Sequence, residues 1–176
     1  MAKEEKAIIL DFLPQGYANR RHAEPIAQAL GRNFSLLELV PKEGQTVKPE
    51  EEVYIGEGHR DKIRYVKKIL NYENLTNFAK NLLEPIVKKI VKEEESRFVN
   101  FFNKSSSITP RMHQLELIPG LGKKHVQDII KERRNKPFES YDDIIKRVRL
   151  FPDPIKAIVK RVMLELSKDE KYHIFT

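Results

Sequence analysis

The chain has 176 residues, a length that fits one ordinary domain or two small ones. It contains no cysteine, which excludes disulfides, thiol catalysis and cysteine-ligated zinc or iron–sulfur sites. Its apolar runs fall far short of the roughly 18 residues that a membrane span needs. Glu4 and Glu5 stand where a signal peptide would be basic or apolar, so we expect a soluble, cytoplasmic protein.

Positive charge is concentrated in the C-terminal part of the chain. Lys and Arg number 33 against 26 Asp and Glu, a net charge of +7. Residues 104–176 hold 16 basic and 10 acidic side chains, whereas residues 1–103 hold 17 and 16. Because a local positive field recruits polyanions through counterion release, nucleic acid is the leading partner class. A Lys- and Glu-rich surface typical of heat-adapted proteins is the alternative, and it explains the abundance of charge but not its asymmetry.

Four apolar segments within the first seventy residues are bounded by turn residues and predict strands: 6–13, 34–40, 53–55 and 62–70. Between the first two, residues Glu24–Gly31 predict a short helix, with Pro25 in its first turn and Gly31 just past its end. Four short strands with turns between them favour a small β-barrel, with residues 15–21 left over as a long loop.

From Leu75 onward, apolar residues recur at three- and four-residue steps, the spacing of amphipathic helices. Pro85 predicts a break, so we expect two helices here, followed by an aromatic segment at Arg97–Phe102 that packs between domains. Residues 103–107 have the composition of a linker. The predicted fold class is α+β, with a small barrel domain at 1–72, connecting helices at 73–103 and an all-α domain at 104–176.

The most informative segment follows this linker. Thr109 and Pro110 predict the start of a short helix, and residues 118–124 then read Ile-Pro-Gly-Leu-Gly-Lys-Lys before a second helical pattern. Two glycines allow a tight reversal and let a phosphate approach the backbone N–H groups. A helix N-terminus and two lysines add positive charge at the same place. The predicted phosphate contacts are Gly120, Leu121, Gly122, Lys123 and Lys124; a hairpin used only for packing or protein contact is the alternative.

Residues 115–133, with the segment 137–144 that follows, resemble the helix-hairpin-helix motif of sequence-independent nucleic-acid binders. The resemblance implies a monovalent cation held by the backbone carbonyls of Glu116, Ile118 and Leu121, and no other cofactor. A second copy appears on shifting the sequence by 33 residues, with Asp-Pro-Ile at 153–155 in place of Gly-Leu-Gly. An acidic side chain repels phosphate and proline lacks a donor, so this copy is expected to be structural or to contact phosphate weakly. Its candidate contacts are Lys156, Lys160 and Arg161.

Over nearly its whole length the sequence also resembles an uncharacterised archaeal family of predicted RNA-binding proteins. The matching segments include 9–16, 36–42 and 53–63, followed by the two hairpins in the same order. The resemblance implies an OB-like N-terminal barrel ahead of the helix-hairpin-helix unit, and RNA binding as the function.

A second basic surface is predicted on the barrel. Strand alternation would place Arg60, Lys62 and Arg64 on one face and Ile63 and Tyr65 on the other. A basic strand beside tyrosines suits an OB-type groove for single strands, whereas a solvated barrel face is the alternative. Arg20, Arg21 and His22 in the long loop could extend such a groove.

Catalysis finds little support in the sequence. The five histidines lack metal-ligand spacing, and neither a P-loop nor a G-x-S-x-G motif is present. We therefore predict a non-enzymatic nucleic-acid-binding protein. RNA is favoured and DNA stays open, because helix-hairpin-helix units mostly meet duplex DNA whereas OB-like barrels mostly meet single strands. The alternatives are a protein-interaction adaptor in translation, transcription or repair, and a small nuclease or lyase.

Overall fold

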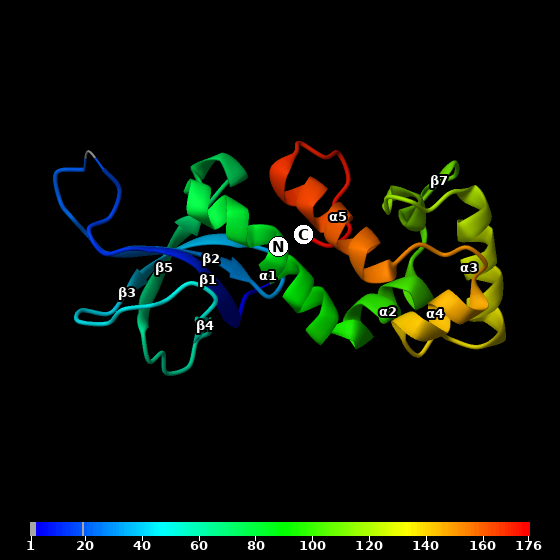
Figure 1. Cartoon of the computed structure of the whole chain (residues 1–176), viewed down its shortest axis with the longest axis horizontal. Coiled ribbons are helices and arrows are strands. Elements are labelled where there is room, and N and C mark those ends of the chain that lie inside the picture. The colour runs from blue at the N-terminus through cyan, green and yellow to red at the C-terminus, as the bar shows by residue number, and fades with distance from the viewer. Residues whose placement is uncertain (1–2, 19) are drawn as a thin grey trace. The chain divides into compact units, whose positions relative to one another are not determined.

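The computed structural model describes residues 3–18 and 20–176, which form two compact units (Figure 1). The first unit contains the residues up to Ile86 together with Glu165–Thr176, and the second contains Val87–Leu164. The division therefore falls inside a helix, at a different place from the serine-rich segment 103–107 where the sequence predicts a linker.

A five-stranded antiparallel sheet, curled into a half-barrel, builds the first unit. Its spatial order is β4-β1-β2-β3-β5, so β4 and β5 are its edges. The strands are β1 (Lys6–Leu13), β2 (Ile26–Gly31), β3 (Leu36–Pro41), β4 (Glu52–Tyr54) and β5 (Ile63–Ile69). Alternate residues of these strands, among them Ile9, Ala27, Ala29, Leu37 and Leu39, form the core on one face.

Residues 26–31 form the central strand β2, so the helix predicted at Glu24–Gly31 is wrong. All six residues of β2 are buried, and the strand pairs with β1 on one side and β3 on the other. A short apolar run that is buried on both faces has no alternation to distinguish it from a helix. Pairing with two neighbours and burial outweigh the local signals of Pro25 and Gly31.

Helix α1 (Asn77–Glu93) is continuous, with Pro85 inside it, so the prediction of two separate helices is also wrong. Proline removes one helical hydrogen bond, but a stripe of buried side chains runs on both sides of it and holds the helix together. The stripe consists of Ala79, Leu83, Ile86, Val87, Ile90 and Val91. The helix follows the 3₁₀ turn η1 (Tyr72–Asn74), and Thr76 caps its start by accepting the N–H of Ala79 at 3.1 Å.

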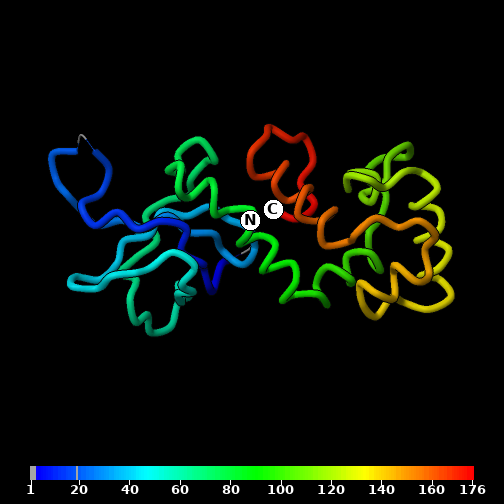
Figure 2. Tube along the Cα trace, viewed as in Figure 1, coloured from blue at the N-terminus to red at the C-terminus, as the bar shows by residue number. Residues whose placement is uncertain are grey.

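The second unit is mainly helical, and Figure 2 follows its chain from α3 through the connection at 136–140 into α4 and α5. Its elements are α2 (Glu95–Lys104), β6 (Ser107–Thr109), β7 (Met112–His113), η2 (Gln114–Leu117), α3 (Lys123–Asn135), α4 (Tyr141–Arg147) and α5 (Pro154–Ser167), whose last residues belong to the first unit. The predicted aromatic segment lies in α2, where Phe98, Val99 and Phe102 are buried. The predicted linker is part of this unit, because Ser105 is buried and Asn103 bonds the backbone of Phe138.

The C-terminal segment is anchored by a buried carboxylate. Glu165 accepts the backbone N–H groups of Ile174, Phe175 and Thr176 at 2.8 to 3.1 Å. Within residues 3–18 and 20–176, no helix has both the length and the apolar character needed to cross a bilayer.

Candidate nucleic-acid interface

The predicted phosphate site lies in the turn between η2 and α3. The helix expected to start at Thr109 is not formed: residues 107–113 make the small β6–β7 hairpin, and only the four-residue 3₁₀ turn η2 precedes the reversal. His113 caps η2, since its Nδ1 accepts the N–H of Leu115 at 3.1 Å. Helix α3 begins at Lys123, as the glycine-lysine pattern predicts.

The two glycines of this turn have different roles. Gly120 has φ +91°, a left-handed conformation that non-glycine residues seldom adopt. Gly122 is the N-cap of α3 with φ −92°, and a side chain there would meet open space. Of the two glycines expected to make the reversal, only Gly120 therefore has a conformation that needs glycine.

Two of the three predicted donors already have partners. The N–H of Leu121 bonds the carbonyl of Ile118 at 3.1 Å, and the N–H of Gly122 bonds Nδ1 of His125 at 3.1 Å. The amide of Gly120 has no hydrogen-bond partner among the described residues. The first amides of α3 cannot be satisfied within the helix, so those of Lys123 and Lys124 also face outward. Gly120 thus keeps its predicted donor, whereas the amides of Lys123 and Lys124 take the place of those of Leu121 and Gly122.

Both predicted lysines are exposed at this helix end. The ammonium of Lys124 lies 3.1 Å from a carboxylate oxygen of Asp128, one turn further along α3, in a solvent-exposed pair. No ion pair of Lys123 occurs in the described part of the chain. Lys123 therefore contributes the less compensated charge beside the N-terminus of α3.

The turn before α5, which belongs to the second predicted copy, has different chemistry. Helix α5 begins at Pro154, and Asp153 caps it by accepting the N–H of Lys156 at 3.2 Å. Arg161, predicted as a weak phosphate contact, is only 3% exposed and points to the carbonyl of Leu117, 3.5 Å away. Burial removes it from that role, while Lys156 and Lys160 stay exposed.

His125 connects the two hairpins. While its Nδ1 accepts from Gly122, its Nε2 lies 3.0 Å from the carbonyl of Leu150 in the second turn. The neutral ring with the proton on Nε2 satisfies both contacts, because Nδ1 must then be an acceptor and Nε2 a donor. The ring also meets Phe151 edge to face.

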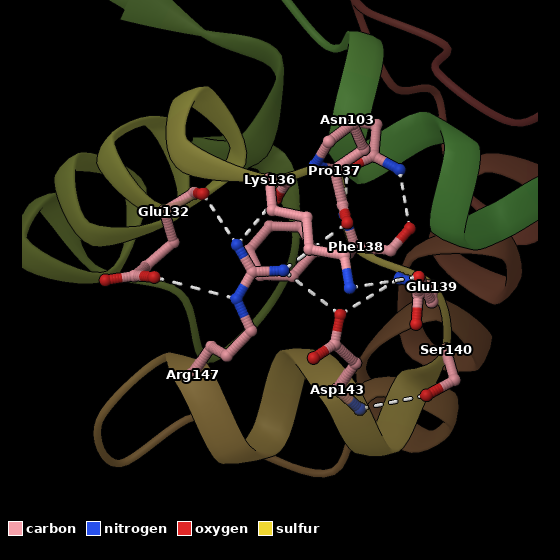
Figure 3. Close-up of polar contacts among 9 residues, drawn as sticks. All are labelled: Asn103, Glu132, Lys136, Pro137, Phe138, Glu139, Ser140, Asp143 and Arg147. Carbon is pink, nitrogen blue, oxygen red and sulfur yellow. Dashed lines mark hydrogen bonds and ion pairs between the residues drawn. The ribbon is translucent and has the colours of Figure 1, made fainter.

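The segment after α3 is held by one arginine (Figure 3). The guanidinium of Arg147 donates to the carbonyls of Glu132 and Lys136, both at 2.6 Å, and to Asp143 at 3.1 Å. It also covers the ring of Phe138 at 4.5 Å. The bonded Glu139 amide, followed by Arg147, holds the pKa of Asp143 below its usual range. This network closes the end of α3 onto the start of α4 and so supports the hairpin frame.

The basic face predicted on the barrel is only partly formed. Strand β5 begins at Ile63, so Arg60 and Lys62 precede it and only Arg64 lies on it. Arg60 donates to the carbonyl of Gly56 at 2.7 Å, and Lys62 pairs with Glu51. The pairing with β3 is irregular at Arg64, whose side chain is exposed next to the ring of Tyr65.

The predicted site residues do not form a cluster of metal ligands. Among the described residues, no three His, Asp or Glu side chains gather in a way that could hold a metal ion. The carbonyl of Ile118, one of three predicted for a monovalent cation, accepts the N–H of Leu121.

Sequence reasoning missed one buried polar cluster on the sheet. Gln28 and Glu38 stand opposite each other on β2 and β3, and both are fully buried. The sequence signal for this cluster was Glu38, a charged residue inside the apolar run of β3. Because residues 24–31 were expected to form a helix, the sequence did not indicate that Gln28 lies opposite it.

Comparison with known proteins gives consistent matches along the chain. A family model described as "Protein of unknown function (DUF655)" matches residues 3–176. The uncharacterized protein MJ0038 of Methanocaldococcus jannaschii is 45% identical over 175 residues, which cover 98% of this chain and 79% of that protein. The crystal structure of Af1531 from Archaeoglobus fulgidus, described as a family model of DUF655, has a TM-score of 0.85 and 44% identity, covering 98% of this chain and 99% of that one.

Proposed function

The chain belongs to the DUF655 family of archaeal proteins, and we propose that it is a non-enzymatic nucleic-acid-binding protein with RNA as its favoured ligand. The observation that carries this proposal is the turn at 118–122, which leads into the positive end of α3. Outward-facing amides and exposed lysines meet there within a basic part of the chain.

The turn supports one phosphate contact. The amides of Gly120, Lys123 and Lys124 lack partners inside the turn or helix, and the side chain of Lys123 adds a full charge. In this proposal η2, the turn and α3 act as a helix-hairpin-helix unit whose first helix is reduced to one 3₁₀ turn. Phosphate contacts of this kind carry no sequence information, so binding would be sequence-independent.

The half-barrel provides the second surface and favours RNA over duplex DNA. OB-type barrels bind single strands in a surface groove, where successive bases stack on aromatic rings. Arg64 beside Tyr65 is the exposed pair on β5 that fits this role.

A protein-interaction adaptor is the second candidate, and one observation favours it. Leu150 in the second turn is 83% exposed and has φ +55°, and Ile145 on α4 is 45% exposed. Exposed apolar side chains at a hairpin tip suit a protein partner better than a phosphate backbone.

Salt-titrated binding tests the proposal. Fluorescence anisotropy with labelled single-stranded RNA and with duplex DNA of equal length should show affinity that falls steeply with salt. The double variant Lys123→Glu/Lys124→Glu should flatten the salt slope by about one unit for each lost phosphate contact. Lys88→Glu/Lys89→Glu, two exposed lysines of α1, is the control for net charge.

Two results would contradict the proposal. Equal loss of affinity in both double variants would show that binding depends on the net charge of the protein and not on the turn at 118–122. Affinity that does not depend on salt would favour the adaptor. Incubation of the same RNA with and without a divalent metal tests the nuclease alternative, for which cleavage would be the positive result.

A further inference from the structure

One polar row crosses the otherwise apolar sheet. Asp11 stands opposite Gln28, Gln28 opposite Glu38, and Glu38 opposite Lys68. Directly opposite residues on neighbouring strands project from the same face, with Cβ atoms about 5 Å apart. This face is the one opposite the core of Ile9, Ala27 and Leu39, because alternate residues point to opposite faces.

Glu38 is the unexplained member of this row. Its side chain is 0% exposed, and neither carboxylate oxygen accepts a hydrogen bond of normal geometry from the described residues. The Tyr17 hydroxyl interacts with this carboxylate closely enough to raise the pKa of Tyr17, and it is the group that a ligand would have to replace. Burying a carboxylate that accepts no hydrogen bond of normal geometry is strongly unfavourable, so such a group points to a missing ligand.

Gln28, beside it, presents a donor. Its Nε2 donates to the hydroxyl of Tyr17 at 3.0 Å and to the carbonyl of Asn74 at 2.9 Å, while its Oε1 accepts the N–H of Thr76. The backbone contacts fix the orientation of the amide, and one N–H is directed at Tyr17. The Gln28 and Glu38 pair thus offers one donor next to two acceptors.

Tyr17 covers this pair from the loop between β1 and β2. Burial, and after it the nearby Glu38 carboxylate, raises the pKa of Tyr17 to about 12. At the base of the loop, Gly16 has φ +69° and its Cα approaches Glu24 so closely that a Cβ would lie 2.7 Å from that carbonyl. The position of Tyr17 therefore depends on a backbone conformation at Gly16 that other residues seldom adopt.

A cavity of about 30 Å³ lies beside Tyr17, lined in part by Arg20, His22 and Lys67. It has room for one water, so a larger ligand needs the space that the Tyr17 side chain occupies. Lys67 is paired with Glu24 at 2.9 Å, which leaves Arg20, 5.2 Å from the ring of Tyr17, as the arginine that lines the cavity. This rim attracts anions.

We propose that the Gln28 and Glu38 pair is a binding site for the base of a guanine nucleotide, which replaces Tyr17. The Watson–Crick edge of guanine presents an acceptor, O6, followed by two donors, N1–H and N2–H. These groups match the donor of Gln28 and the two oxygens of Glu38, and the phosphate meets Arg20 at the rim. Single-stranded bases are commonly read on this edge.

Other ligands fit less well. Adenine and cytosine present one amino group beside an unprotonated ring nitrogen, which would face a carboxylate oxygen. Uracil has a single N–H between two carbonyls. A simple cation would satisfy Glu38, but the charge of Arg20 at the rim repels it. Guanine is therefore the base whose Watson–Crick edge offers two adjacent donors to the carboxylate, and the phosphate of its nucleotide can meet Arg20.

Calorimetric titration with GMP, IMP and AMP tests the site, since IMP lacks only the 2-amino donor. The intact protein should bind GMP at least tenfold more tightly than IMP or AMP. Glu38→Gln should abolish that preference, whereas Glu73→Gln, at an exposed glutamate, should keep it. Tyr17→Ala should bind GMP several-fold more tightly, because it removes the competing side chain.

The melting temperature of Glu38→Gln reports on its folding, and it should not fall, since the substitution removes an unpaired buried charge. Equal affinity for the three nucleotides in both the intact protein and Tyr17→Ala would overturn the proposal, as would a Glu38→Gln variant that keeps the preference.

A second arm uses single-stranded RNA with one guanine or with inosine in its place. A preference for guanine in RNA alone assigns the site to a base presented by a strand, and a preference with GMP as well extends it to the free nucleotide. The RNA arm rests on the proposed function. The variant Lys123→Glu/Lys124→Glu separates the guanine site from the proposed function, because it should weaken RNA binding and leave the preference for GMP unchanged.

Discussion

The Nδ1 atom of His125 accepts the backbone N–H of Gly122 at 3.1 Å, so the turn before α3 holds one of its own anion donors. The same ring reaches the carbonyl of Leu150 through Nε2 at 3.0 Å. The His125 side chain therefore occupies the N–H of Gly122, which an anion could otherwise bind, and links the turn before α3 to Leu150.

Removing this side chain should release the amide. We expect His125→Ala to bind single-stranded RNA about tenfold more tightly, since one hydrogen bond to a charged group contributes about 1.5 kcal/mol. The variant should melt at a lower temperature, because the contacts with Gly122 and Leu150 are lost. Anisotropy at a temperature where both proteins are folded measures the effect, with His59→Ala as control. Weaker binding would show that His125 orders the turn for its ligand.

The same substitution should act in opposite directions at the two glycines of the turn. Gly120→Ser forces a left-handed conformation on a residue with a Cβ and should cost about 1–2 kcal/mol of unfolding free energy. Gly122→Ser adds a preferred N-cap at an extended position with open space and should be neutral or stabilising by a few tenths of a kcal/mol. Urea unfolding of the pair decides between them, and equal losses would contradict the assigned roles.

Arg147 should not tolerate replacement by lysine. Its guanidinium donates to the carbonyls of Glu132 and Lys136 while covering the ring of Phe138, a combination that an ammonium cannot reproduce. Arg147→Lys should lower the unfolding free energy by about 2–3 kcal/mol. Arg149→Lys, an exposed neighbour, should stay within about 0.5 kcal/mol of the parent protein. A small effect at both positions would show that the connection at 136–140 is held by other contacts.

Stability should fall on mild acidification because of His113. Burial, and then the charge of Arg133, lowers the pKa of His113 below its ordinary value of 6.5. Below about pH 6.5 the unfolded chain then binds this proton more readily than the folded protein, so the unfolding free energy decreases as pH falls toward the folded-state pKa. Protonation would also break the cap that Nδ1 provides to Leu115.

Denaturant unfolding between pH 8 and 5.5 measures this dependence, in a range above the titration of most carboxylates. His113→Asn should flatten the curve, because asparagine does not titrate, and the exposed His59→Asn should leave it unchanged. A parallel decline in His113→Asn would assign the pH dependence to another group.

Local sequence determined the turn at 118–122 and the helix that follows it. Gly120 takes up a conformation that excludes most other residues, and the spacing of Val126 and Ile129 buries one face of α3. The cap at Asp153 and the start of α5 at Pro154 are equally local, since an aspartate followed by a proline favours a helix start. Each of these features depends on residues within a few positions of one another, so one sequence is enough to predict it.

Tertiary structure decided the features in which distant residues meet. Strand β2 exists because β1 and β3 pair with it on both sides, and helix α1 continues through Pro85 because its apolar stripe is buried. Strand register sets Gln28 beside Glu38 and buries that carboxylate near Tyr17, and a slip of one residue would turn both side chains to the other face of the sheet. Pairing, burial and register arise between segments separated along the chain, and for that reason the propensities of the individual residues do not contain them.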